Sequence, residues 1–491
     1  MSHPQTVDSD VTRRSFFQHV GRGVQGAALA SLLSEDVFGS DLSEKADSSS
    51  MQIPSDLRPR QTHHEPRARS IIQLFMNGGP SQMDLFDPKE ELEKNHGKSW
   101  FGNIAGEVES PAAAGALTRS WFKFAQHGEC GMWVSEALPH IARCVDDLAL
   151  IRSMQTTNLT HEPALFKIHS GQEMPGLPAF GAWVTYGLGT ENQNLPAYVV
   201  LDDPKGLPVN HTQSWQAGYL PPVFQGTRFR STGTPVLNLA RDFDEPDAVT
   251  SLERELYTKL NRLHRDRRPH QPDLDARIAS YELAARMQLS TSDALDLSSE
   301  TQSTLDMYGI GTEPTDSYGR RCLYARRLVE RGVRFIQLFI DFQIWDNHTG
   351  LETGLKSACD RTDKPIAGLL KDLKSRGLLE STLVVWGGEF GRLPIAQLPA
   401  DKNASNAGRD HNKNAMVTWM AGGGVNGGVT FGSTDELGFS AADDKVTVAD
   451  WHATILHLLG LDYEKLFYPR NGLKERLTGV NEAHVIQGIL A

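Results

Sequence analysis

Carboxylate and imidazole side chains in this sequence lie beside short apolar runs that have the pattern of buried strands. Five of them could bind a metal ion: Asp84, Asp346, His348, Glu389 and His411. In an open parallel sheet, ligands bind beyond the carboxyl ends of the strands, where side chains from separate loops meet. Oxygen and nitrogen atoms that converge in this way are the ligands of divalent metals. The sequence therefore predicts a divalent metal site, with Zn, Ca, Mn or Mg as the candidate ions.

Three more residues could act on a substrate at such a site. His161 opens a segment with the character of a helix, and its imidazole titrates near neutral pH, so it could be a general base or a further metal ligand. Arg392 and Arg409 could hold an anionic group, because a guanidinium suits sulfate or phosphate. Plainer interpretations stay open: each arginine could form an ordinary salt bridge, and Glu389 could cap a helix or pair with Arg392.

The elements that would position these residues follow from the apolar pattern. Unbroken apolar runs predict buried strands at residues 71–76, 148–154, 333–340, 382–386 and 415–420. Apolar residues at helical spacing predict helices over residues 318–331, 366–373 and 451–459, with a glycine after each. Strands that alternate with helices indicate an α/β fold, in which a mostly parallel sheet is covered by helices on both faces.

The middle of the chain has a different character. Residues 252–263 and 276–287 have the pattern of amphipathic helices with many charges. They predict a helical insertion around residues 240–315 that covers the sheet. The chain from residue 67 to residue 491 is otherwise expected to form a single domain.

The charge balance excludes one class of partner. The 491 residues include 49 Lys and Arg against 61 Asp and Glu, which gives a formal net charge of −12. Nucleic-acid binding requires a basic surface, so no nucleic-acid partner is expected. No long uninterrupted apolar run occurs, so no membrane span is expected in the mature chain. The four cysteines permit two disulfides, Cys130 with Cys144 and Cys322 with Cys359, or unpaired buried thiols.

The N-terminus resembles an export signal. Residues 12–17 place two arginines before a serine and two phenylalanines, and a mildly apolar stretch follows at residues 24–33. This arrangement resembles a twin-arginine signal, which directs folded proteins across a membrane; an ordinary amphipathic helix is the alternative. We therefore expect an export signal at residues 1–40 and a flexible linker at residues 41–66. The twin-arginine export machinery is then a partner, and the protein is periplasmic or secreted.

Five short segments together resemble a known family. They are Gly78-Gly79-Pro80-Ser81 with Asp84, His161-Glu162-Pro163-Ala164, Trp345-Asp346 with His348, Gly388-Glu389-Phe390-Gly391-Arg392, and Gly408-Arg409-Asp410-His411. In this order they are similar to the exported bacterial family called domain of unknown function 1501, from about residue 66 to about residue 480. That family is similar to sulfatases and belongs to the alkaline phosphatase superfamily, so the resemblance implies a sulfatase-like fold.

The resemblance also implies roles for particular residues. It places Asp346, His348 and His411 where the superfamily has metal ligands, and Glu389 where it has an aspartate ligand. Two features depart from the superfamily pattern. The residue after Glu389 is a phenylalanine where a sulfatase has a nitrogen ligand, and His161 stands in the place of the nucleophile.

Three functions fit these observations. The first is a metal-dependent hydrolase of sulfate or phosphate esters, with an anionic ester or a sulfated glycan as substrate. The second is a non-catalytic relative that binds a metal or an anionic glycan, which the missing nucleophile favours. The third is an exported protein that uses the fold as a scaffold, because a fold alone does not establish an activity.

Overall fold

The computed structural model describes residues 54–230, 246–268 and 271–491. The predicted export signal, residues 1–40, lies outside the described residues, and so does the first part of the predicted linker. The described residues belong to two compact units. Helix α6 (Asp247–Asp266) belongs to one unit and corresponds to the first helix of the predicted insertion, and the other elements belong to the larger unit. Among the described helices, none has both the length and the apolar character that crossing a membrane requires.

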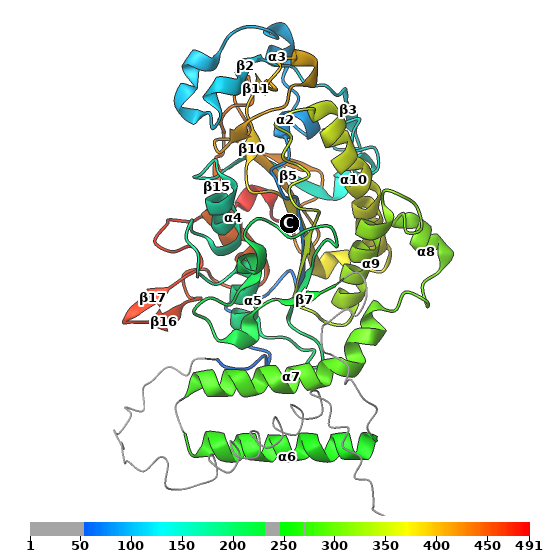
Figure 1. Ribbon diagram of the computed structural model, residues 1–491, viewed down its shortest axis with the longest axis vertical. Coiled ribbons are helices and arrows are strands. Elements are labelled where there is room, and N and C mark those ends of the chain that lie inside the picture. The colour runs from blue at the N-terminus through cyan, green and yellow to red at the C-terminus, as the bar shows by residue number, and fades with distance from the viewer. Residues whose placement is uncertain (1–53, 231–245, 269–270) are drawn as a thin grey trace, which may run out of the picture. The chain divides into compact units, whose positions relative to one another are not determined.

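The larger unit is built around a sheet of nine described strands (Figure 1). Neighbouring strands follow the order β14-β5-β13-β9-β1-β8-β6-β7, and β15 pairs with β5. The strands are β1 (Ser70–Phe75), β5 (Leu148–Gln155), β6 (Tyr198–Leu201), β7 (Thr227–Phe229), β8 (Phe335–Phe339), β9 (Thr382–Gly387), β13 (Met416–Ala421), β14 (Val429–Phe431) and β15 (Val446–Thr447). Each pairing is parallel except those of β13, which runs antiparallel to β5 and β9. The predicted α/β fold with a mostly parallel sheet is therefore confirmed.

Short antiparallel pairs lie outside this sheet. They are β2 (Ala114–Leu117) with β11 (Ile395–Gln397), β3 (Phe124–His127) with β4 (Met132–Ser135), β10 (Gly391–Arg392) with β12 (His411–Asn412), and β16 (Tyr468–Arg470) with β17 (Leu473–Glu475). Two of these pairs, β2–β11 and β10–β12, carry or adjoin the candidate site residues.

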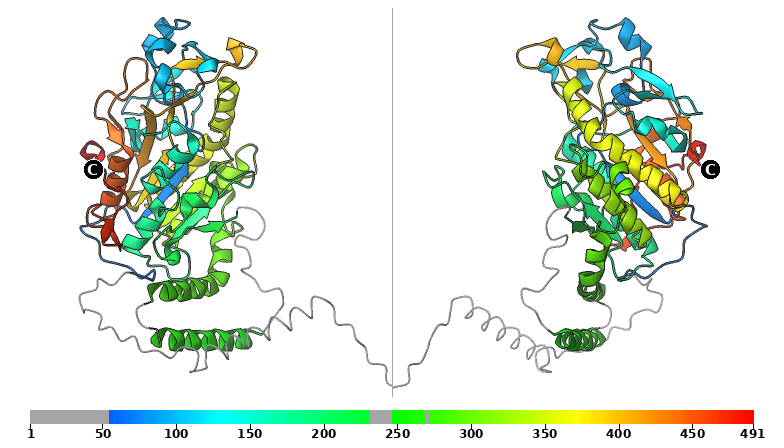
Figure 2. Two further views of the ribbon diagram at one scale, coloured as in Figure 1. Left: turned by 60° about the vertical axis from the view of Figure 1, so that its left-hand side comes forward. Right: turned by 90° about the vertical axis from the view of Figure 1, so that its right-hand side faces the viewer.

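Helices cover both faces of the sheet (Figure 2). The helices of the larger unit are α2 (Gln82–Leu85), α3 (Glu90–Lys94), α4 (His161–Ser170), α5 (Phe180–Leu188), α7 (Pro272–Leu295), α8 (Gln302–Met307), α9 (Asp316–Glu330), α10 (Leu351–Ser375) and α11 (Val448–Leu458). Helices α4, α5 and α11 pack on one face, where the rings of Phe180 and Phe335 are 5.4 Å apart. Helices α9 and α10 pack on the other. All six residues of β1 are buried, as both faces of a covered sheet require.

Helix α10 is longer than the apolar pattern indicated. We expected a helix over residues 366–373, but α10 runs from Leu351 to Ser375 and continues through Pro365. A proline removes one backbone donor and usually ends or kinks a helix. One side of α10 is buried against α9 along much of its length, and this packing compensates for the missing hydrogen bond.

The predicted linker ends earlier than residue 66. Leu57 is buried, the amide of Arg60 donates to the carbonyl of Leu188, and the amide of His63 donates to the carbonyl of Gly460. Residues 54–66 are therefore part of the larger unit, because tertiary hydrogen bonds order a segment that its polar composition alone assigns to a linker.

The cysteines are all free thiols, so neither of the two possible disulfides forms. Cys144, Cys322 and Cys359 are buried and Cys130 is exposed. Burial raises the pKa of the Cys144 thiol to about 11, which keeps that thiol protonated and unreactive at neutral pH.

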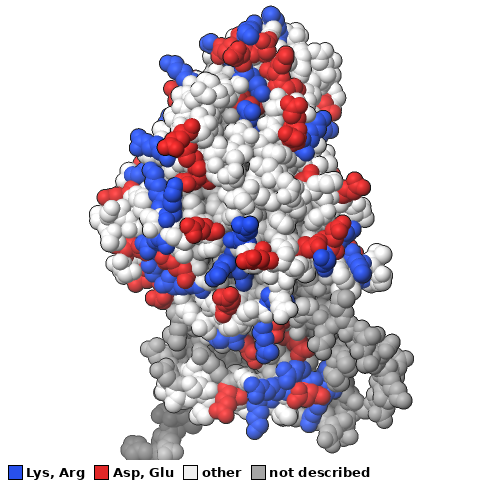
Figure 3. All heavy atoms as spheres, turned by 180° about the vertical axis from the view of Figure 1, so that it is seen from behind, with Lys and Arg blue, Asp and Glu red and all other residues white. Residues whose placement is uncertain are grey.

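Charged side chains of both signs are interspersed on the face shown in Figure 3. That face carries no continuous basic band of the kind that follows a nucleic-acid backbone.

Candidate metal centre

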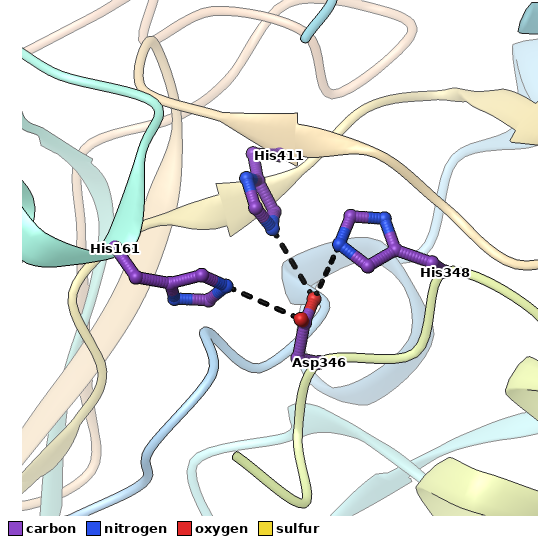
Figure 4. A group of neighbouring side chains, drawn as sticks. All are labelled: His161, Asp346, His348 and His411. Atoms are coloured by element: carbon purple, nitrogen blue, oxygen red, sulfur yellow. Dashed lines mark hydrogen bonds and ion pairs between the residues drawn. The ribbon is translucent and has the colours of Figure 1, made fainter. Parts of the chain in front are cut away.

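Four side chains from distant parts of the chain meet at one point (Figure 4). They are His161, Asp346, His348 and His411, and one possible ligand atom of each lies within 4.8 Å of the others. The Asp346 carboxylate is at the centre: Oδ1 is 2.9 Å from Nε2 of His348 and 3.2 Å from Nε2 of His411. The other oxygen, Oδ2, is 3.2 Å from Nε2 of His161. Each imidazole therefore presents the same nitrogen, Nε2, to the same carboxylate.

The sheet brings these residues together. His161 is the first residue of α4, which follows β5, and Asp346 and His348 lie in the loop between β8 and α10. His411 begins β12 and pairs with Arg392 of β10, which follows β9. Strands β8 and β9 flank β1 and are parallel to it, so the segments that leave their carboxyl ends emerge at one edge of the sheet.

Gly78 lets two of these loops approach each other. Its backbone has φ +107, and a Cβ atom at this position would lie 2.6 Å from the amide nitrogen of Asp346. The Gly78 amide donates to Oε1 of Glu389 at 2.9 Å. A side chain at residue 78 would therefore displace the loop that carries Asp346, because backbone atoms cannot yield as a flexible side chain can.

The second nitrogen of each imidazole, Nδ1, is held by an acceptor. Nδ1 of His161 lies 2.7 Å from Oε1 of Glu389, and Nδ1 of His348 lies 2.5 Å from Oε1 of Gln397. Nδ1 of His411 lies 2.6 Å from the carbonyl of Leu159. Carboxylate, amide and carbonyl oxygens accept hydrogen bonds, so each Nδ1 carries the proton and donates it. The lone pair of each neutral ring is then on Nε2, which is the arrangement found around metal-bound histidines.

The local charges favour an ionised Asp346. Burial alone would raise the pKa of its carboxyl, but Arg392 and the three imidazoles hold that pKa well below its usual range. Burial alone would lower the pKa of His161, but the contacts with Asp346 and Glu389 outweigh it and raise that pKa to about 9. Contact with Asp346 likewise raises the pKa of His348 against the effect of its burial. In the absence of a metal, His161 is thus protonated at neutral pH.

Solvent reaches the group from one side. The side chain of His411 is 2% exposed and that of His161 is 15% exposed, whereas that of His348 is 32% exposed. An ion bound among these residues would therefore be enclosed on most sides and open beside His348. Catalytic metal sites keep an open position of this kind, and structural sites are closed.

The structure brings together three of the five predicted ligands: Asp346, His348 and His411. His161, which we expected to be a general base or a further ligand, completes the group. Glu389 is not one of the four but contacts one of them. Its carboxylate is fully buried and accepts hydrogen bonds from His161 and from the amide of Gly78.

Asp84 lies apart from the group, which corrects its assignment as a ligand. Its carboxylate accepts a hydrogen bond from Nε of Arg409 at 2.7 Å, and both side chains are fully buried. The hydroxyl of Ser81 also donates to it. Buried ion pairs of this kind satisfy both charges, so neither partner is available to an ion or substrate.

Arg392 and Arg409 do not form the expected anion clamp. Arg392 donates to Asp346 at 2.8 Å and to the carbonyl of Gly79 at 2.9 Å, and its side chain is 1% exposed. Arg409 donates to Asp84 and, at 3.2 Å, to the carbonyl of Leu393. Both guanidinium groups bond to other parts of the protein. Arg392 orients Asp346, and Arg409 joins separate segments of the chain.

Two residues of the site could not be identified from the sequence. Gln397 holds His348, and Oε2 of Glu109 lies 2.6 Å from Nδ1 of His411. The hydrogen bond to His411 lowers the pKa of Glu109, with burial opposing it. Neither residue adjoins a ligand motif, and their roles depend on contacts between distant segments, so no pattern in one sequence reveals them.

Glu109, Asp410 and His411 form a second close group. The Nδ1 of His411 contacts both the carbonyl of Leu159 and Oε2 of Glu109, and one Asp410 oxygen accepts the amide of Ser110 at 2.8 Å. Glu109 and Asp410 therefore hold the segments around His411 in place by hydrogen bonds.

Comparison with solved structures finds similar chains at low sequence identity. The lipoteichoic acid synthase LtaP from Listeria monocytogenes is 8% identical, with a TM-score of 0.35, and the match covers 83% of this chain and 76% of that one. The PsFucS1 sulfatase from Pseudoalteromonas sp. is 11% identical, with a TM-score of 0.33, over 81% of this chain and 68% of that one. The TAB5 alkaline phosphatase is 12% identical, with a TM-score of 0.30, over 74% and 92% of the two chains.

Among curated proteins, no sequence matches this chain. A family described as "Protein of unknown function (DUF1501)" matches residues 68–490, which includes every residue of the candidate metal centre. This span agrees with the extent of the resemblance found in the sequence. The chain therefore belongs to the DUF1501 family.

Proposed function

We propose that this protein is a metal-dependent hydrolase of sulfate or phosphate esters, with zinc as the ion that its ligands favour. One observation carries the proposal: three imidazoles, each fixed through Nδ1, direct Nε2 at the carboxylate of Asp346. The ester class rests on the resemblance described for the sequence.

The residues fit a metal ion. Nε2 of His161 is buried and makes no hydrogen bond, although it lies 3.2 Å from Oδ2 of Asp346. A buried polar atom without a hydrogen bond is costly, and a cation between the nitrogen and the carboxylate would satisfy both. Three nitrogen ligands and one oxygen suit zinc, whereas Ca and Mg prefer oxygen ligands throughout.

A divalent ion held by these four residues would supply a Lewis acid and lower the pKa of water at the site. The chain's own residues would hold and orient it: Glu389 and Gln397 fix two of the imidazoles, and Arg392 fixes the carboxylate. The described hydrogen bonds of the four residues include no hydroxyl or thiol group. Water is therefore the nucleophile in this proposal.

A second candidate function is metal or anionic-glycan binding without catalysis. The buried positions of Arg392 and Arg409 favour it, because neither guanidinium is free to hold an anionic group. Measurement of turnover separates the two candidates.

The first test is elemental analysis of the purified protein beside two variants. We expect one equivalent of zinc in the wild type and in His484→Ala, whose side chain is 82% exposed, and loss of the metal in His161→Ala. Metal-loaded protein is then assayed with p-nitrophenyl sulfate and p-nitrophenyl phosphate. Metal with turnover supports the hydrolase, and metal without turnover on either ester supports the binding protein. A protein that takes up no metal overturns the hydrolase and the metal-binding candidate.

We also propose that the twin-arginine segment exports the protein to the periplasm or beyond. The paired arginines of residues 12–17 support this proposal. Replacing Arg13 and Arg14 by lysine should retain the protein in the cytoplasm, as cell fractionation would show. Unchanged export of that variant would overturn the proposal.

A further inference from the structure

A cleft of about 680 Å³ is lined by none of the four candidate metal ligands, and the proposed reaction makes no use of it. Its lining includes Ala396 and Leu398, which flank Gln397, the residue that holds His348. Residues 118–123, which follow β2, also line the cleft. A volume of this size accommodates a ligand larger than a single small ion.

An aromatic ring that lines the cleft is in contact with a buried arginine. Trp121 is half-buried, and the buried guanidinium of Arg409 lies 5.3 Å from the centre of its ring. Arg409 also donates to the carbonyls of Thr118 at 3.1 Å and Arg119 at 3.2 Å. Its position is fixed in turn by the buried carboxylate of Asp84. Arg409 therefore covers one face of the indole, and Trp121 also packs against the main hydrophobic core and lines the cleft.

Polar side chains of both signs line the same cleft. Arg119 and Lys123 supply donors, and Glu352, at the start of α10, supplies an acceptor. Arg119 is paired with Glu93 at 3.4 Å, but both side chains are 58% exposed. Such a pair is weak in water, so Arg119 can exchange it for a ligand at little cost.

The combination points to one class of ligand. A fixed aromatic face attracts the C–H face of a ring, because the π cloud is electron-rich. Donors and acceptors side by side match groups that both donate and accept, as hydroxyls do. The mixed signs do not suit a nucleic acid, whose binding requires a basic surface. A purely apolar ligand would leave the charged groups unused.

We propose that this cleft is a carbohydrate-binding site, in which one sugar ring stacks on Trp121 and its hydroxyls bond to Arg119, Lys123 and Glu352. Arg409 is then a positioning residue of the cleft, because it supports the indole and the backbone around it. The proposal stands independently of the reaction at the metal centre.

The test is isothermal titration of the full-length protein with four hexasaccharides: those of cellulose, mannan, polygalacturonate and chondroitin sulfate. We expect at least one to bind, and Trp121→Ala to weaken that binding about tenfold. Trp121→Phe, which keeps an aromatic face, should retain most of the affinity. The matched control is Trp133→Ala: Trp133 is 42% exposed and lies outside the cleft, so its loss should leave binding unchanged.

Two further variants make the result decisive. Lys123→Ala alters an exposed residue of the cleft and should weaken binding without unfolding the protein. His161→Ala should lose the metal yet bind sugar normally, so failure of the metal proposal and failure of this one are separable. The carbohydrate proposal is overturned if no hexasaccharide binds, or if Trp121→Ala and Lys123→Ala both bind as well as the wild type.

Discussion

At the scale of single residues, the candidate site depends on Asp346. Its carboxylate meets three imidazoles and Arg392, and no other acidic group in the described residues lies at their common point. The imidazoles are useful as ligands only because an acceptor outside the group holds each Nδ1. Glu389 is the most buried of these acceptors, so we expect its loss to change the orientation of its histidine most.

The role of Glu389 leads to the first prediction. Glu389→Gln keeps the shape of the side chain but removes the charge that supports His161. We expect metal affinity to fall by about ten- to a hundredfold, as is typical when a carboxylate behind a metal-bound histidine is lost. A competition titration with a chromophoric chelator measures this change. Glu380→Gln, at an exposed position, should match the wild type, and equal affinities for all three proteins would refute the role of Glu389.

The raised pKa of His161 leads to a second prediction, on pH. Contacts with Asp346 and Glu389 raise that pKa to about 9, so the metal-free ring carries an extra proton at neutral pH. A metal must displace this proton to bind Nε2, and metal affinity should therefore rise with pH and level off near pH 9. The slope should be about tenfold per pH unit, because one proton is released for each metal bound.

This proton release can be counted directly. Titration calorimetry in buffers with different ionisation enthalpies gives the number of protons released at each pH. Glu389→Gln should level off at a lower pH, since loss of one of the two carboxylates lowers the pKa of His161. An affinity for the metal that is constant between pH 6 and pH 9 is incompatible with this account.

At the scale of elements, short segments after the strands determine the geometry of the site. The pair β10–β12 aligns Arg392 with His411, so the residue that orients Asp346 and one of the ligands share a two-residue ladder. The turn after β1 has to pass close beneath the loop of Asp346, and this close approach is what Gly78 permits.

The third prediction concerns this turn. Gly78→Ala should destabilise the protein by about 3 kcal/mol, because it adds backbone strain to a collision with the Asp346 backbone. Gly97→Ala is the matched control: Gly97 has φ +82, but nothing lies within 4 Å of a Cβ there. Strain alone should cost the control about 1 kcal/mol. Urea unfolding measures both values, and similar values for the two variants would show that the turn does not require a glycine for close approach.

At the scale of the whole molecule, the metal centre joins distant parts of the chain. Its four residues come from the start of α4, the loop before α10 and the start of β12. Binding at a point shared by separate segments stabilises the folded state, because the unfolded chain cannot assemble the same ligands.

The fourth prediction follows from this linkage. Removal of the metal by a chelator should lower the unfolding temperature, and added zinc should restore it. The stabilisation should reach about 4 kcal/mol when free metal is a thousandfold above its dissociation constant. Differential scanning calorimetry shows the shift. His161→Ala should unfold at the same temperature with or without chelator, and a wild type that is insensitive to chelator would argue against a tightly bound ion.

The sequence by itself determined five of the nine described strands of the sheet, and most of the helices. Buried strands covered on both faces are continuous apolar runs, and the runs at residues 71–76 and 382–386 correspond to β1 and β9. It also placed the ligand-bearing residues at strand ends, because the positions of Asp346 and His348 just after β8 follow directly from the order of the chain.

Only the tertiary structure decided which of these residues act together. Asp84 and Glu389 look like ligands in the sequence, but one pairs with buried Arg409 and the other supports His161. The sequence could not show this, because a carboxylate bonds to whichever donor the folded chain brings near it. The role of Gln397 could not be predicted for the same reason. Gln397 and His348 are 49 residues apart in the chain. Only the packing of β11 against the loop before α10 makes them neighbours.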